Sequence, residues 1–201
     1  MQMTYFSQAQ MDQTKLDHKI ERYTSSTGEL IAWVKIPTLD YDDDTTIYMY
    51  YGNASASSQQ NVSDTWNSNY IAVWQLNEIV TDESTAGTHA DSTSSGENGT
   101  RNNNDDIAGK IATAQDFDNT ADYINNGDDA DLDFTNSADF SFTTWVNLDA
   151  TGNSEMIMAK KMVPAGLHID LTWLTIKLIN TTTNKRYKCH RSNMDSCRLC
   201  L

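Results

Sequence analysis

The stretch Phe140-Ser-Phe-Thr-Thr-Trp-Val-Asn-Leu148 decides the fold class, because its side chains alternate in character along the chain. An extended chain would place Phe140, Phe142 and Thr144 on one face and the residues between them on the other. A period of two residues is typical of a β-strand with one buried face. We therefore predict a strand over residues 140–148, with Trp145 in the core.

Other short stretches are rich in β-branched and aromatic residues, which favour strands. They lie at residues 29–36, 45–51, 70–76, 114–117 and 123–124. Polar turns rich in Gly, Asn and Asp separate these stretches. Short strands joined in this way predict an all-β fold, an antiparallel β-sandwich of the jelly-roll kind. The acidic turn between the first two stretches predicts that they pair with each other. Trp74, within 70–76, is expected in the core.

Residues 77–109 are almost wholly polar, and this length predicts a functional or flexible loop. The small polar residues 54–63 are compatible with a short helix or a linker.

The 201-residue chain has a formal net charge of −14, which repels phosphate and argues against nucleic-acid binding. It is compatible with cation binding. No run of 18 apolar residues occurs, so no segment is predicted to span a membrane. Residues 1–13 lack the basic flank and apolar centre of a signal peptide, so we expect any export signal to lie outside this sequence.

The charge changes sign near the C-terminal end. Residues 1–155 contain 26 acidic and 6 basic residues, whereas residues 156–201 contain 2 acidic and 8 basic ones. The three cysteines, Cys189, Cys197 and Cys200, also lie in the second part. We interpret residues 161–201 as an atypical basic, Cys-containing tail. A shifted reading frame and an unrelated extension both explain such a tail.

Five segments in one order and spacing carry a resemblance to a known family. They are Tyr70–Glu78, Asp91–Thr100, Gly109–Asp118, Asp122–Ile124 and Phe140–Val146. Together they resemble the laminin-G-like, concanavalin A-like jelly-roll modules of prokaryotic surface proteins. The chain departs from the family pattern at Gln75, where His is frequent, and at Asn119, where Gly is usual. The resemblance covers residues 66–160 and stops before a full module is complete.

A second resemblance covers residues 15–65. It is carried by Ala32-Trp-Val-Lys-Ile-Pro37 and Thr46-Ile-Tyr-Met-Tyr-Tyr-Gly-Asn53. These look like the C-terminal part of an uncharacterised β domain that often precedes such jelly rolls, and residues 1–14 are expected to be irregular. The two resemblances imply a secreted or cell-surface location and ligand or carbohydrate binding, often with calcium. The resemblances do not imply that the chain catalyses a reaction.

An acidic run supplies the candidate metal ligands. Asp129, Asp131 and Asp133 alternate along the chain, and alternate positions in a loop can direct several oxygens at one Ca²⁺ ion. An EF-hand is excluded, because Phe134 and Phe140 occupy the positions that need Gly and Glu. The simpler interpretation is a solvated acidic surface.

Catalytic patterns are absent from the sequence. Glycosidases on concanavalin-like folds carry a Glu-x-Asp-x-Glu ladder, and none occurs here. There is no His-x-x-x-His pair and no Gly-x-Ser-x-Gly elbow. We therefore expect no enzyme, and a glycoside hydrolase is the weaker alternative.

Aromatic side chains offer a further possible ligand contact. Trp33, Trp66, Tyr48, Tyr50 and Tyr51 could stack on sugar rings, although aromatic residues at alternate strand positions more often belong to a core. Trp66 lies in a polar segment and fits either role. The sequence thus predicts a non-catalytic binding or adhesion module whose partner is a carbohydrate or a surface protein, with its loops in contact with the ligand. The alternative is a structural spacer in an envelope protein.

Overall fold

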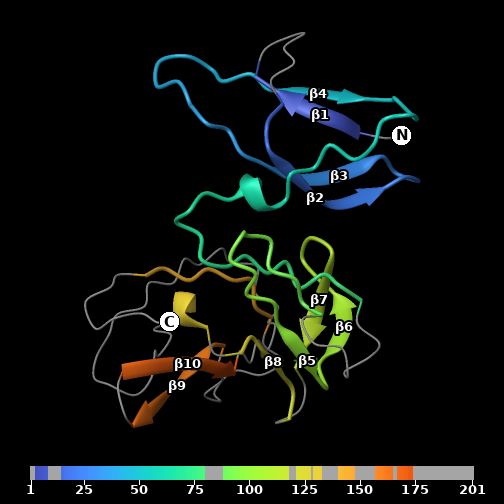
Figure 1. Cartoon of the computed structure of the whole chain (residues 1–201). Coiled ribbons are helices and arrows are strands. Elements are labelled where there is room, and N and C mark those ends of the chain that lie inside the picture. Colours follow the sequence, from blue (N-terminus) through green and yellow to red (C-terminus); the bar gives the residue numbers. More distant parts are fainter. Residues whose placement is uncertain are drawn as a thin grey trace. The chain divides into compact units, whose positions relative to one another are not determined.

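The chain forms two compact units in a computed structural model (Figure 1). The structure describes residues 3–8, 15–79, 88–117, 121–127, 129–132, 140–147, 157–164 and 167–173. Unit 1 comprises Met1–Val73 together with Ser92–Ser94, and unit 2 comprises Trp74–Asp91 and Ser95–Leu201. The returning segment is bound to unit 1, because the Ser92 N–H donates to Val73 O at 2.9 Å.

Unit 1 contains a tight hairpin of β2 (His18–Thr24) and β3 (Glu29–Val34), paired antiparallel from Thr24 opposite Glu29 to His18 opposite Val34. The Gly28 N–H donates to Thr24 O at 2.8 Å, and Gly28 has a φ of +73°, which glycine adopts without strain. The strand predicted at 29–36 is confirmed. Its predicted pairing with 45–51 is wrong, because this turn brings the preceding strand alongside it instead.

The second sheet of unit 1 joins β1 (Met3–Ser7) to β4 (Tyr48–Tyr51). The rings of Tyr5 and Tyr50, which are opposite each other, stack with centroids 4.5 Å apart. β1 lies in the segment that was expected to be irregular. Its five residues gain their order from a partner more than forty positions away, and local periodicity cannot show such a pairing.

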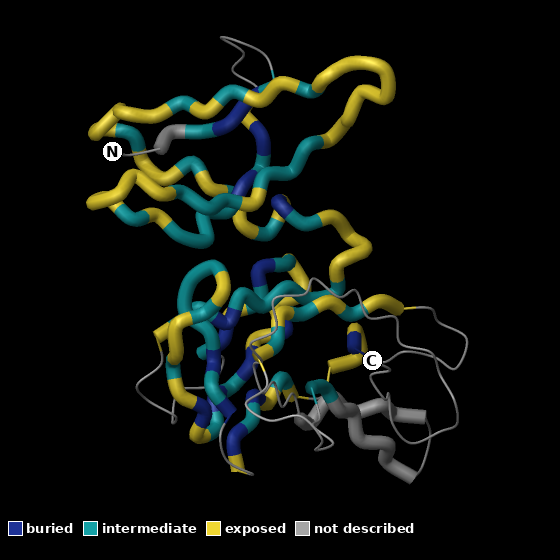
Figure 2. Tube along the Cα trace, turned by 180° about the vertical axis from the view of Figure 1, so that it is seen from behind, coloured by how far each residue is buried: buried dark blue, intermediate teal, exposed yellow. Residues whose placement is uncertain are grey.

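The core of unit 1 is small. Phe6 and Leu16 are buried and joined by an isolated β-bridge. The rings of Phe6 and the buried His18 meet edge to face, with centroids 5.3 Å apart. Figure 2 colours the described residues by how far each is buried. A single turn of 3-10 helix, η1 (Ser63–Thr65), occurs near the end of the segment that was expected to be a helix or a linker.

Unit 2 contains two short antiparallel pairs. β5 (Thr100–Asn102) pairs with β8 (Tyr123–Asn125), and β6 (Asp105–Ala108) pairs with β7 (Thr113–Asp116). The strands predicted at 114–117 and 123–124 are therefore confirmed. The polar stretch 77–109 was expected to be a loop, but β5 and the Asp-rich β6 lie inside it.

Two other strand predictions are wrong. Residues 70–76 contain only an isolated bridge between Trp74 and Asp91, and residues 140–147 form no strand. Burial nevertheless alternates over 141–147, because Phe142, Thr144 and Val146 are half-buried and the residues between them are exposed. Phe140 is exposed and departs from the predicted face. Trp145 belongs to the outward set and is 51% exposed, contrary to its predicted core position.

The core of unit 2 consists of Leu76, Phe117 and Ile124. Trp74, Val146, Ile157 and Met158 pack against this cluster, as expected for Trp74. Two further elements, β9 (Ala159–Pro164) and β10 (Leu167–Trp173), pair antiparallel across the start of the tail. The three cysteines lie outside the described residues.

The all-β fold class is confirmed. Within the described ranges, every sheet is a two-stranded antiparallel pair, and the helical elements are two single 3-10 turns, η1 and η2 (Ala130–Leu132). In the part of the chain that is described, no helix has the length and apolar character to cross a membrane.

Candidate functional site

Three carboxylates converge in unit 2. A ligand oxygen from each of Glu97, Asp129 and Asp131 lies within 4.8 Å of the other two. Asp129 and Asp131 are two of the three predicted calcium ligands. The third, Asp133, lies outside the described residues. Glu97 was not predicted, because it lies in a turn more than thirty residues before Asp129. No sequence spacing links the two residues.

Element η2 positions the two aspartates. The Asp131 N–H donates to Asp129 Oδ1 at 2.9 Å, and the Leu132 N–H donates to Asp129 O at 3.2 Å. Aspartate favours turns of this kind, because its side chain bonds its own backbone two residues on. Leu132 is buried and anchors the turn, while both aspartates remain exposed.

The turn before Glu97 is held by a different carboxylate. Asp91 Oδ2 accepts hydrogen bonds from the Gly96 and Glu97 N–H groups, both at 3.1 Å. The Glu97 carbonyl accepts from Trp74 Nε1 and from Asn126 Nδ2. The backbone of Glu97 is thus fixed at both ends, and its side chain enters the cluster from a defined position.

The cluster is electrostatically unfavourable without a cation. Glu97 is only 4% exposed, and burial is the first cause that raises its pKa to about 7. The negative charges of Asp129, Asp131 and Asp91 raise the pKa further. A buried carboxyl that faces two exposed carboxylates is an oxygen-only donor set, which suits a hard cation such as Ca²⁺.

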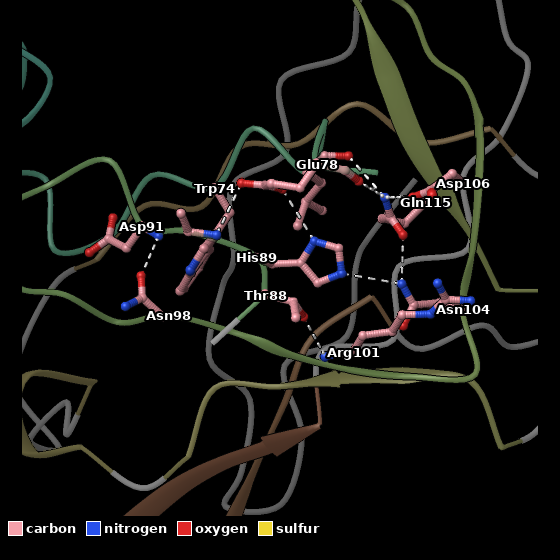
Figure 3. A network of polar contacts seen from close by, with 12 residues as sticks. Trp74, Glu78, Thr88, His89, Asp91, Asn98, Arg101, Asn104, Asp106 and Gln115 are labelled. Atoms are coloured by element: carbon pink, nitrogen blue, oxygen red, sulfur yellow. Dashed lines mark hydrogen bonds and ion pairs between the residues drawn. The ribbon is translucent and has the colours of Figure 1, made fainter. Parts of the chain in front are cut away.

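A buried polar network lies beside the apolar core of the same unit (Figure 3). Asn104 Nδ2 donates to Gln115 Oε1 at 2.7 Å and lies 3.3 Å from His89 Nε2. His89 Nε2 therefore accepts, which leaves Nδ1 to donate to Glu78 Oε2 at 3.2 Å. All three central side chains, His89, Asn104 and Gln115, are fully buried.

Gln115 connects the network to its surroundings. Its Nε2 donates to Asp106 Oδ1 at 2.9 Å and to the carbonyls of Leu76 and Glu78 at 3.3 Å. Both ring nitrogens of His89 are engaged, and no nucleophilic side chain is among its hydrogen-bonding partners. The network therefore fits a structural role in fixing the loops of unit 2.

Glu78 is ionised in this setting. Burial by itself would raise the pKa of Glu78, but the hydrogen bonds from His89 and from backbone N–H groups, including that of Ala90, outweigh it and hold the pKa below its ordinary value of 4.5. The Glu78–His89 pair thus contributes one charged hydrogen bond to the network.

Comparison with known families gives one match. Residues 6–73 match the family described as a domain of unknown function, DUF2341. This range coincides with the main segment of unit 1 and includes residues 15–65, whose sequence resembles an uncharacterised β domain. No curated protein and no solved structure matches the chain. Residues 6–73, about a third of the chain, are therefore similar to the DUF2341 domain.

Proposed function

We propose that unit 2 is a non-catalytic, calcium-dependent binding module of a secreted or cell-surface protein. The observation that carries this proposal is the convergence of Glu97, Asp129 and Asp131 in unit 2. The laminin-G-like resemblance of residues 66–160 supports it independently.

The burial of Glu97 beside two exposed aspartates is what favours a cation. Exposed acidic side chains separate when they repel each other, but Glu97 is enclosed and its backbone is fixed. The Glu97 carboxyl also forms a side-chain hydrogen bond with Asp129, and this contact raises its pKa further, so a cation at the cluster would replace the proton that the two carboxyls share. Calcium takes six to eight oxygen ligands, so three carboxylates leave positions open for water or for ligand hydroxyls. The exposed side of Asp129 and Asp131 gives a ligand access to those positions.

Calcium titration of the full chain tests the site. We expect calorimetric binding of Ca²⁺ and a rise in Tm, because an ion that binds only the folded state stabilises it. Glu97→Gln and Asp131→Asn should lose both effects. Asp43→Asn removes the same charge at an exposed position of unit 1 and should retain them. Equal calcium binding by all four proteins would exclude this site.

A glycan and surface-protein screen with and without calcium tests the function. Binding that requires calcium and is lost in Glu97→Gln supports the proposal. No ligand under either condition favours the structural spacer. Turnover of a polysaccharide would favour the glycoside hydrolase.

A further inference from the structure

Unit 1 contains an aromatic pocket that the acidic cluster does not explain. Its volume is about 340 Å³, at the lower end of the range for small-molecule pockets. Aromatic and polar side chains share its lining, chiefly those of Trp33, Lys35, Thr65, Trp66, Asn67 and Tyr70. All of them come from residues that match DUF2341.

Three rings form one continuous surface in this pocket. The Trp66 ring centroid lies 5.3 Å from the centroid of Trp33 and 5.3 Å from that of Tyr70, with interplanar angles of 51° and 61°. Trp33 is 40% exposed and Tyr70 is 51% exposed, so much of this aromatic surface faces solvent. Contiguous exposed aromatic surface is a common feature of ligand-binding sites.

The rings are held before any ligand arrives. Trp33 Nε1 donates to Glu21 Oε2 from the neighbouring strand β2. The Tyr70 N–H donates to Asn67 O at 3.0 Å, which closes the turn that carries the ring. Trp66 directly follows η1, whose Thr65 is buried and bonds Asn61 O through both its N–H and its hydroxyl. Preorganised rings lose little conformational entropy on binding.

The polar groups of the lining define the ligand class. Trp66 Nε1 is buried and has no acceptor among the described residues, an unfavourable state that a ligand oxygen would relieve. Asn67 uses its side-chain oxygen to accept from the Asn69 N–H, and no described residue accepts from its NH₂ group. The pocket therefore offers ring faces together with hydrogen-bond donors.

Other ligand classes fit less well. A cation could contact the ring faces but offers no oxygen to accept from Trp66 Nε1 or from the Asn67 NH₂ group. An anion would meet a chain of net charge −14, and Lys35, the cation of the lining, already donates to Asp64 O at 2.8 Å. A neutral ligand with apolar C–H faces and hydroxyl oxygens matches both halves of the lining.

We propose that this pocket binds a neutral sugar ring, stacked on the exposed faces of Trp33 and Tyr70. The DUF2341-like unit is then a carbohydrate-binding module in its own right. This site lies in unit 1 and needs no cation, so it is independent of the calcium site proposed in unit 2.

The experiment titrates the full chain with neutral gluco-, manno- and galacto-oligosaccharides in the presence of EDTA, followed by tryptophan fluorescence and calorimetry. We expect binding by at least one of them. Tyr70→Ala and Trp33→Ala should each weaken it roughly tenfold or more, since each removes a stacking face. Tyr41→Ala is the matched control, because Tyr41 is 96% exposed and outside the pocket. Asp131→Asn should bind as the unaltered protein does.

Three results would overturn the proposal. They are an absence of oligosaccharide binding at millimolar concentration, equal binding by Tyr70→Ala and Tyr41→Ala, and saturable binding of choline or of a proline-rich peptide in place of the sugars. Far-UV circular dichroism of each variant confirms folding. If Trp33→Ala is unfolded, Trp33→Leu and Tyr70→Ala carry the test, since leucine keeps an apolar side chain without the ring.

Discussion

The two units differ in how many polar side chains they enclose. Unit 1 exposes large aromatic residues, such as Trp33, Tyr51 and Tyr70, and buries little beyond Phe6, Leu16 and their neighbours. Unit 2 encloses polar side chains beside a core of three apolar residues. Unit 1 thus relies on hairpin pairing and ring contacts, whereas unit 2 relies on a buried hydrogen-bond network that must be complete.

The comparison predicts unequal sensitivity to mutation. Removing a buried polar partner leaves another group unsatisfied, whereas removing an exposed ring leaves only a smaller surface. Hydrogen exchange can measure the amides of β2 and β3 in unit 1 separately from those of β5 and β8 in unit 2. A mutation that destabilises one unit should therefore lower the protection of that unit's amides alone.

Phe117→Ala should have the largest effect. Phe117 is almost fully buried in the core of unit 2, and truncation of such a ring costs about 3–5 kcal/mol. We expect the amides of β5 and β8 to lose protection, while those of β2 and β3 change little. An equal loss of protection in both strand pairs would show that the two units unfold together, contrary to the expected difference.

Asn104→Ala should cause the second-largest loss of stability. This change leaves His89 Nε2 and Gln115 Oε1 without their donor, at about 1–3 kcal/mol for a buried group left unsatisfied. Denaturant unfolding measures the loss. Asn69→Ala serves as the control, because Asn69 is exposed in unit 1. Similar midpoints for the two variants would mean that the network contributes no more than a surface residue.

Gly99→Ala tests how tightly unit 2 is packed. A Cβ at Gly99 would lie 2.4 Å from Ile124 Cγ2 and 3.4 Å from His89 Cβ, and overpacking of this kind costs about 1–3 kcal/mol. Gly52→Ala meets no atom within 4 Å in unit 1, but Gly52 has a φ of +93°. Gly52→Ala should therefore lower the stability by about 1 kcal/mol, from backbone strain alone. A smaller Tm decrease for Gly99→Ala than for Gly52→Ala would refute the packing argument.

The contribution of Glu78 to the pH dependence of unit 2 is the smallest expected effect. The pKa of Glu78 is held below 4.5, so the ionised carboxyl stabilises the fold above that pH. This contribution should disappear as the pH falls through the lowered pKa. Glu78→Gln should therefore be less stable than the unaltered protein near pH 7 and approach it under acid. If the stability of Glu78→Gln and that of the unaltered protein differed by the same amount at every pH, the effect would come from packing and not from charge.

The sequence predicted four of the strands at least in part, namely β3, β4, β7 and β8. The segment 29–36 forms a strand beside a tight glycine turn, and β7 and β8 keep their predicted positions. β1, β2, β5, β6, β9 and β10 were not predicted. β1 depends on a distant partner, and β6 is rich in aspartate. Residues 141–147 alternate in burial, although Phe140 and Trp145 are exposed contrary to the prediction. They pair with no strand among the described residues, since side-chain period specifies which face is buried and not whether a neighbouring strand exists.

The candidate site was predictable only in part. Asp129 and Asp131 were found because alternation within one turn is visible in sequence. Glu97 joins them only through the turn that Asp91 and Gly96 build, and that closure depends on tertiary contacts. The same limit applies to Trp66, whose role depends on two rings from β3 and the turn at Tyr70.

The return of Ser92–Ser94 to unit 1 has a consequence for biosynthesis. Lys19 Nζ donates to Ser92 Oγ at 2.6 Å, and Thr93 Oγ1 donates to Ile71 O at 3.1 Å. A nascent chain that has emerged from the ribosome only as far as Val73 therefore still lacks part of unit 1. The same holds for a gene segment ending there, so a fusion that carries unit 1 to another protein must extend through Ser94.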